Sequence, residues 1–177
     1  YGRGLICLAI NSLQAKKLNL NYMSPVNKSR HQTAFTVSIE AKSGITTGIS
    51  AQDRSKTIKI ATKANVKKKE IVSPGHVFPI IARDGGVLVR AGHTEAACDL
   101  AKFANKGAAG VICEIMNEDG TMARRDDLIA FAKTHKLKIG TIADLIHYRT
   151  LKEKTVEKLY SKTITIDGMN FKLKAWK

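Results

Sequence analysis

The chain has 177 residues, which suits one domain with a sizeable hydrophobic core. Its composition, 44% hydrophobic and 25% charged, is typical of a globular protein, and no apolar run reaches the roughly 18 residues needed to cross a membrane. The net charge of +15 suits either nucleic acid or an anionic, phosphorylated metabolite. Because the lysines are scattered and aromatic residues make up only 6%, stacking platforms for single strands are missing. We therefore expect no nucleic-acid partner and no membrane association.

The cysteines and the first residues indicate the setting of the chain. Cys7, Cys98 and Cys113 are odd in number, lie in apolar runs and lack Cys-x-x-Cys spacing, which is typical of reduced cysteines in a cytoplasmic protein. The chain opens at Tyr1 and enters a buried-looking run within a few residues. Since a domain rarely starts inside its own core strand, we expect the chain to continue upstream.

Hydrophobic periodicity predicts strands that alternate with helices. Residues 34–41 alternate between apolar and polar side chains, as a half-buried strand does. Ser50 and Asp53 form a variant of the capping box that opens a helix, and Asn11 or Ser12 can cap an earlier one. Strands are expected at 5–10, 34–41, 45–49, 77–82, 86–89, 110–116 and 138–141, and a hairpin with an Asp-Gly turn at 163–176. Helices are expected at 13–18, from 50, 94–107, from 126 and 142–159. This order, together with one expected antiparallel pair of strands, predicts an α/β (α+β) domain in which a mixed sheet carries flanking helices.

Glu114 is the most informative single residue. It stands between Cys113 and Ile115 in an apolar run, where an unpaired charge is costly to bury. Two interpretations follow. The acid lies on a solvated face of its strand, or it is a carboxylate with a raised pKa that is poised for proton transfer.

Two glycine-containing segments supply further candidates. Residues 90–94 place an arginine, a flexible backbone and a hydroxyl at a helix start, which are the parts of a phosphate site. Within them, His93 is either a metal ligand or a loop histidine. His76 follows Pro-Gly and is either a turn histidine bonded to backbone or a general acid or base. Cys7 lies beside these candidates, and the loop 117–120 is either a cation site or a plain turn.

Four segments in order resemble 3,4-dihydroxy-2-butanone 4-phosphate synthase, an enzyme family of riboflavin biosynthesis. They are 46–54, 74–79, 90–96 and 110–124, and the resemblance covers about residues 1 to 149. It implies a lyase that converts D-ribulose 5-phosphate to 3,4-dihydroxy-2-butanone 4-phosphate and formate, assisted by Mg²⁺ or Mn²⁺, in a cytoplasmic homodimer. A base beside a ketone and a cation on the resulting enediolate suit that chemistry.

The resemblance also implies roles for individual residues. His76 and Glu114 would be essential for catalysis, and His93 would be a metal ligand. The substrate would be held by Glu114 and by Arg90, Ala91, Gly92, His93 and Thr94. Candidate pocket residues are Cys7, Thr46, Thr47 and Asp53.

The departures from the family are at the two ends. The family's acidic segment, which supplies another metal carboxylate, would lie upstream, so His93 alone should bind magnesium poorly. Residues 1–149 would form the N-terminally truncated synthase domain, and 150–177 a linker and the start of a GTP cyclohydrolase II-like domain, as in bifunctional members. The alternative is a catalytically inactive, synthase-like module for dimerisation or binding, since without the acidic segment we expect little turnover.

Overall fold

A computed structural model describes residues 1–154 and 156–177. The helices are α1 (Ser12–Leu18), α2 (Ala51–Ala61), α3 (His93–Phe103), α4 (Arg125–Thr134) and α5 (Ile142–Lys152), with short 3-10 helices η1 (Lys68–Glu70) and η2 (Gly86–Leu88). The strands are β1 (Cys7–Ile10), β2 (Ile39–Ala41), β3 (Ile71–Ile81), β4 (Ala109–Ile112), β5 (Lys158–Ile166) and β6 (Met169–Trp176). Among the described residues, no helix is both long and apolar enough to cross a membrane.

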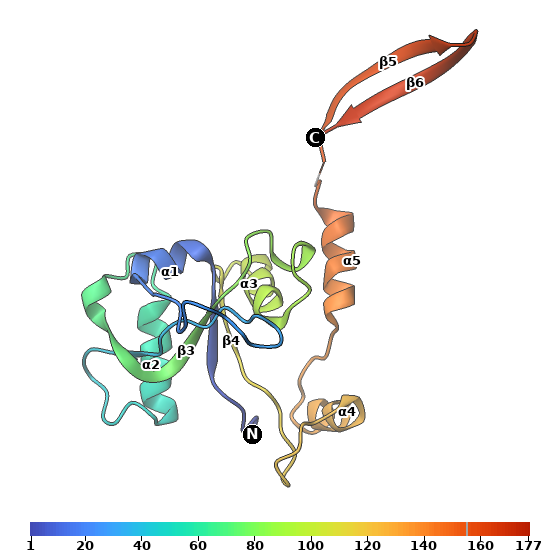
Figure 1. The fold of residues 1–177 in the computed structure, drawn as a ribbon. Coiled ribbons are helices and arrows are strands. Elements are labelled where there is room, and N and C mark those ends of the chain that lie inside the picture. The colour runs from blue at the N-terminus through green and yellow to red at the C-terminus, as the bar shows by residue number, and fades with distance from the viewer. Residues whose placement is uncertain (155) are drawn as a thin grey trace.

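A four-stranded sheet in the order β2-β3-β1-β4 forms the centre of the protein (Figure 1). The central pair β1 and β3 is parallel, while β2 and β4 join antiparallel at the two edges. A mixed sheet with flanking helices is thus confirmed. β1 is buried along its whole length because neighbouring strands lie on both sides and helices cover both faces.

Alternate residues of β1 face the two helical layers. Leu8 and Ile10 pack with α1 and α2 in the main core, and neither side chain is exposed. Burying each of these side chains stabilises the fold by about 1.5–3 kcal/mol. Ala9 faces the other way and packs with Cys98 of α3. The sheet therefore lies between α1 and α2 on one face and α3 on the other.

Local sequence signals set the starts of the first two helices. The side chain of Asn11 accepts a hydrogen bond from the amide of Gln14 and caps α1. Ser50 caps α2 in the same way, through the amide of Asp53. Both caps confirm the expectation, because each satisfies an amide that the helix itself leaves without a partner.

Two of the expected strands, 45–49 and 86–89, do not form. Their backbone amides donate to buried carboxylates, and glycine turns bend the chain. In 45–49, the amides of Thr46 and Gly48 donate to the carboxylate of Asp53, so the segment loops around the start of α2. In 86–89 the chain forms η2, following positive φ angles of 95° and 65° at Gly85 and Gly86.

Four further expectations fail, three of them at the ends of elements and one because a strand is missing. β4 ends at Ile112, short of the expected residue 116, and residues 138–141 form no strand. The strand expected at 34–41 shortens to Ile39–Ala41, with an isolated bridge at Phe35. α5 ends at Lys152, where the expectation extended it to 159. It thus runs through the expected domain boundary at 149/150.

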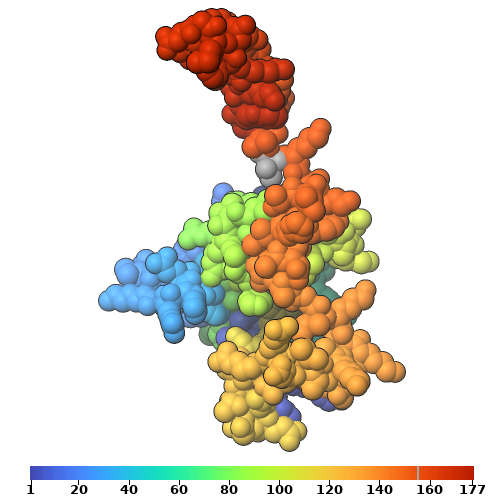
Figure 2. Space-filling view, turned by 90° about the vertical axis from the view of Figure 1, so that its right-hand side faces the viewer, coloured from blue at the N-terminus to red at the C-terminus, as the bar shows by residue number. Residues whose placement is uncertain are grey.

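The C-terminal hairpin projects from the body of the protein (Figures 1 and 2). Its turn has left-handed backbone at Asp167 and Gly168, with φ of 51° and 78°, which confirms the Asp-Gly turn. One face is largely apolar and the other polar. The apolar face carries Tyr160, Ile164, Ile166, Met169, Phe171, Leu173 and Ala175.

Candidate functional site

The two expected catalytic residues lie on either side of the segment that enters β1. Cys7 of β1 pairs with Phe78 of β3 on one side and with Ile112 of β4 on the other. His76 stands two residues before Phe78 on β3. The ladder between β1 and β4 ends at Ile112, and beyond it Arg3 bridges Ile115, one residue out of that register, so Glu114 lies beside Gly4. His76 and Glu114 therefore lie on either side of the segment that leads into β1.

Ala9 of β1 lies on the face of the sheet that α3 covers. Gly110 pairs with Ala9, and a Cβ on Gly110 would lie 3.0 Å from the Cβ of Ala97 in α3. Cys7 shares the same face. Burial, then Glu114 and Cys113, raise the pKa of Cys7 to about 11. Its thiol is protonated at neutral pH and serves as a core group beside the site.

His76 has a carboxylate partner that the sequence did not reveal. Its Nδ1 contacts the Oε1 of Glu40 in β2, and the side chain of His76 is 45% exposed. Gly48 makes room for the pair, because a Cβ there would overlap the Glu40 carboxylate. The only sign of Glu40 in the sequence was its place among the polar residues of the alternation in 34–41. A carboxylate on one ring nitrogen selects the tautomer and leaves Nε2 for other chemistry.

Glu114 is exposed, in the segment that follows β4. The prediction that an apolar strand encloses it is wrong, and the solvated interpretation is the one the structure supports. The amide of Leu5 donates a hydrogen bond of 3.0 Å to its Oε2. A Cβ on Gly4 would lie 2.6 Å from that same oxygen, so the backbone approaches the carboxylate closely and orients it.

The loop before α2 supports the pair formed by His76 and Glu40. Asp53 is 5% exposed and accepts hydrogen bonds from the hydroxyl of Thr46 at 2.7 Å and from the amide of Gly48 at 3.1 Å. The hydrogen bond from Thr46 is the main cause that lowers the pKa of Asp53, so its carboxylate is charged. Thr47 is exposed on the same loop. Asp53 thus holds the glycine that lies against Glu40 and His76.

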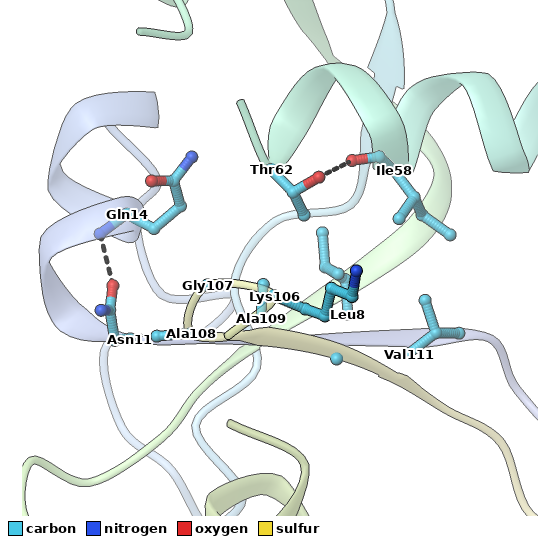
Figure 3. A pocket seen from close by; sticks show the side chains of 11 residues that line it. Leu8, Asn11, Gln14, Ile58, Thr62, Lys106, Gly107, Ala108, Ala109 and Val111 are labelled. Carbon is cyan, nitrogen blue, oxygen red and sulfur yellow. Dashed lines mark hydrogen bonds between the residues drawn. The ribbon is translucent and has the colours of Figure 1, made fainter. Parts of the chain in front are cut away.

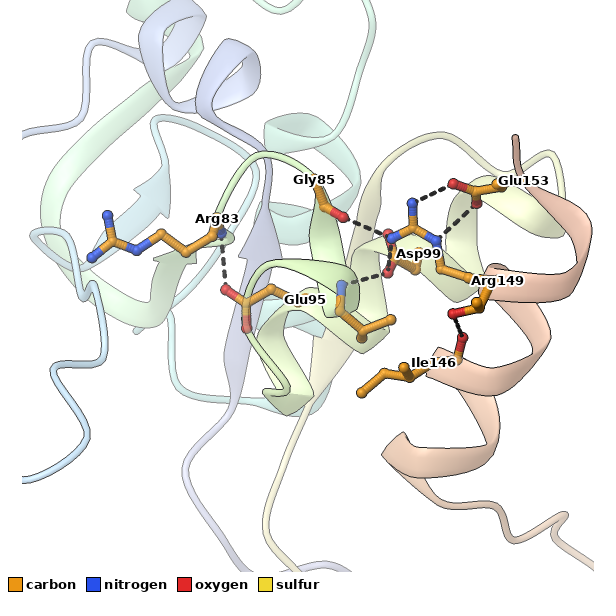
Figure 4. A network of polar contacts seen from close by, with 9 residues as sticks. Arg83, Gly85, Glu95, Asp99, Ile146, Arg149 and Glu153 are labelled. Carbon is orange, nitrogen blue, oxygen red and sulfur yellow. Dashed lines mark hydrogen bonds and ion pairs between the residues drawn. The ribbon is translucent and has the colours of Figure 1, made fainter. Parts of the chain in front are cut away.

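The segment 90–94 runs into the N-terminus of α3, as expected for an anion site. His93 is the first residue of the helix and is exposed, whereas Thr94 is buried. The guanidinium of Arg90 donates from Nη1 to the Oε2 of Glu95 at 2.7 Å and from Nη2 to the carbonyl of His31 at 3.3 Å. Figure 4 shows Glu95 between Arg83 and the remainder of α3.

Two cavities lie away from His76 and Glu114. The larger, about 840 Å³, is a groove between the loop 22–35, the segment 81–84 and Val89. It borders Arg90, whose neighbour Val89 lines it, and its size suits a small ligand. The smaller, about 230 Å³, lies between α1, α2 and the start of β4 (Figure 3). Neither of the two is lined by His76 or Glu114.

The metal site expected at His93 is not complete in this part of the protein. Across residues 1–154 and 156–177, no group of three or more His, Cys, Asp or Glu side chains is placed to hold a metal ion. Magnesium prefers several oxygen ligands, and the nearest carboxylate along α3, Glu95, is already bonded to Arg83 and Arg90. The described residues alone therefore do not fit a magnesium ion.

The fold and site together define an α/β domain with a histidine–carboxylate pair on the sheet and an arginine at a helix start. Comparison with known proteins specifies the family. The family model for 3,4-dihydroxy-2-butanone 4-phosphate synthase matches residues 1–148. The chain belongs to this family, which confirms the resemblance seen in the sequence.

Three relatives illustrate the relationship. The "Riboflavin biosynthesis protein RibBA" of Aquifex aeolicus is 54% identical over 179 residues, covering 100% of this chain and 44% of that protein. The crystal structure of RibBX from A. baumannii, a two-domain 3,4-dihydroxy-2-butanone 4-phosphate synthase, is 52% identical with a TM-score of 0.88. It covers 99% of this chain and 52% of that one. A structure of the synthase in complex with two magnesium ions is 35% identical with a TM-score of 0.81, covering 86% of this chain and 76% of that one. The chain spans about half the length of the curated relatives it matches.

Proposed function

We propose that the protein is a lyase that converts D-ribulose 5-phosphate to 3,4-dihydroxy-2-butanone 4-phosphate and formate in riboflavin biosynthesis. The observation that carries this proposal is the contact of His76 with Glu40, together with a Glu114 carboxylate oriented by the amide of Leu5, inside a chain of this family. An acid and a base held by ordered contacts are what proton removal beside a ketone requires.

His76 acts as the acid–base group at its free nitrogen. Glu40 engages Nδ1, so Nε2 is left to take a proton from the substrate and to return it. Glu114, oriented by the amide of Leu5, serves the second proton transfer. Its exposure lets a substrate hydroxyl approach the carboxylate directly.

Arg90 and the start of α3 hold the substrate phosphate. Backbone amides of the first helical turn point toward an anion there, and the helix dipole favours negative charge. Ala91, Gly92, His93 and Thr94 supply this turn, and Gly92 keeps its backbone open. The groove beside Val89 gives the sugar phosphate a place to enter.

Magnesium is the proposed metal, with manganese as the alternative, and His93 is the ligand this chain would contribute. A relative in complex with two magnesium ions supports the choice of metal. The described residues do not complete the coordination of this metal. We further propose a cytoplasmic homodimer. Residues 1–149 form the synthase domain, and residues 150–177 form the link to a second domain.

A catalytically inactive dimerisation or binding module is the alternative. The incomplete metal site among the described residues favours it. The family membership and the ordered His76 and Glu40 pair favour the enzyme.

The test measures formate release from ribulose 5-phosphate with magnesium by the full-length protein. His76→Ala and Glu114→Gln should each lower kcat by about 10²–10⁴, as expected for lost acid–base catalysis. His147→Ala and Glu157→Gln, at exposed positions in α5 and just before β5, are matched controls and should keep full activity. A folded parent protein that releases no formate would refute the enzyme and leave the binding module.

A further inference from the structure

Glu95 is a buried carboxylate whose two oxygens hold two different parts of the chain. It is 1% exposed in the first turn of α3. Its Oε1 accepts the amide of Arg83 at 2.8 Å (Figure 4). Its Oε2 accepts Nη1 of Arg90 at 2.7 Å. One side chain thus joins the segment after β3, the helix and the arginine.

We propose that Glu95 is a positioning residue that fixes the guanidinium of Arg90 for binding the phosphate of the substrate. This rests on the proposed function, in which Arg90 holds that phosphate. The side chain of Arg90 is 32% exposed, whereas that of Glu95 is 1% exposed, so the pair has a buried end and an open end. A guanidinium carries five N–H groups. Glu95 and the carbonyl of His31 take one each, and the others remain for an anion.

The gain from this arrangement is preorganisation. A free arginine loses rotamer freedom when it binds a phosphate, and that loss weakens binding. Here the ordering is complete before the ligand arrives, because Glu95 is itself anchored by Arg83. The backbone at Gly92 lies against both partners, since a Cβ there would overlap Nη1 of Arg90 and approach Oε2 of Glu95.

Asp99 offers a matched control on the same helix. It lies one turn further along α3, is 8% exposed, and accepts the amide of Val87 at 2.9 Å. Its arginine is Arg149 of α5, at 2.8 Å. The chemistry is the same as at Glu95, but the arginine held there is not in the proposed substrate site. If Glu95 had only a structural role, replacing Glu95 and replacing Asp99 would have the same effect on phosphate binding.

The experiment compares Glu95→Gln with Asp99→Asn in two measurements. The first is the Kd for inorganic phosphate by titration calorimetry, and the second is KM and kcat for ribulose 5-phosphate. Glu95→Gln should raise both the Kd and KM up to about tenfold, the weakening expected when one side chain must be ordered on binding. Its kcat should change less than KM. Asp99→Asn should stay within about twofold of the wild type in both constants.

A double-mutant cycle tests whether Glu95 acts through Arg90. In an Arg90→Ala background, Glu95→Gln should change the Kd for phosphate little, because the group it positions is gone. If Glu95→Gln does not fold, Gly92→Ala replaces it, since its φ of −121° suits alanine and the added methyl separates the pair without removing a charge. Gly92→Ala should raise the same Kd.

The two proposals fail separately. Phosphate binding that weakens only in Glu95→Gln, in a wild type that releases no formate, would refute the synthase reaction and keep the positioning role. Formate release with equal constants for Glu95→Gln and Asp99→Asn would overturn the positioning role alone. A wild type that does not bind phosphate, or an equal effect of Glu95→Gln with and without Arg90, would also overturn it.

Discussion

Replacing Arg149 by methionine should destabilise the protein through the carboxylate it leaves behind. Arg149 of α5 is buried, and its guanidinium donates to Asp99 at 2.8 Å and to the carbonyl of Gly85 at 2.8 Å. It also makes two bonds with Glu153, of 2.8 and 2.7 Å, and these are the main cause that raises the pKa of Arg149. The substitution keeps most of the side-chain volume but removes every one of these donors.

The magnitude follows from the surroundings of Asp99. Removing one partner of a buried ion pair costs about 3–5 kcal/mol, because the other charge is left without compensation. Asp99 keeps the amide of Val87, and its side chain is 11% exposed, so we expect the lower end, about 3 kcal/mol. For a chain of this length that corresponds to a Tm lower by about 6–12 °C.

Urea unfolding followed by circular dichroism measures this change, with the double variant Asp99→Asn/Arg149→Met as the informative control. Removing the orphaned charge should restore more than half of the lost free energy. A loss below about 1 kcal/mol in the single variant would refute the reasoning. So would a double variant that is less stable than the single one. Either result would mean that Asp99 is well solvated when Arg149 is absent.

Three further predictions concern titration and the hairpin. Because hydrogen bonds from Thr46 hold the pKa of Asp53 below its ordinary 3.8, the charged form stabilises the fold fully above about pH 5, and the stabilisation is lost as pH falls through the depressed value. The stability difference between wild type and Asp53→Asn, measured in urea, should therefore shrink below about pH 4, and a difference that grows there would contradict this. Burial raises the pKa of Cys7 to about 11 and of Cys98 to about 12, so iodoacetamide at about pH 8 should label Cys113 first by mass spectrometry, and native labelling of Cys98 would oppose this. Deleting residues 156–177 should shift the Tm of the remainder by less than about 2 °C, since the hairpin strands pair with each other and project from the body, and a larger fall would indicate docking.

Features that depend on neighbouring residues were predictable from the sequence. Caps at Asn11 and Ser50 act within three residues, and the turn at Asp167 and Gly168 is set by two backbone conformations. The alternation of strands and helices likewise predicted a sheet with flanking helices. These signals act between residues a few positions apart, so they do not depend on the tertiary structure.

Motifs also indicated which residues are candidates for the site, but not which contacts hold them. His76, Glu114 and Arg90 were candidates from their segments alone. That Glu114 lies exposed, beyond the end of β4 and bonded to the amide of Leu5, depends on where β1 lies beside β4. Sequence hydrophobicity could not show this, because an apolar run reads the same when its last residues leave the sheet.

The partners of these residues were decided by the tertiary structure. Glu40 and His76 are 36 positions apart and meet because β2 pairs with β3. Glu95 reaches Arg83 because α3 packs back against the end of that strand. The sequence by itself determined which side chains are available, their local conformations and the family. Which carboxylate binds which histidine or arginine follows from strand order and helix packing, since contacts between distant residues form only when the whole sheet is assembled.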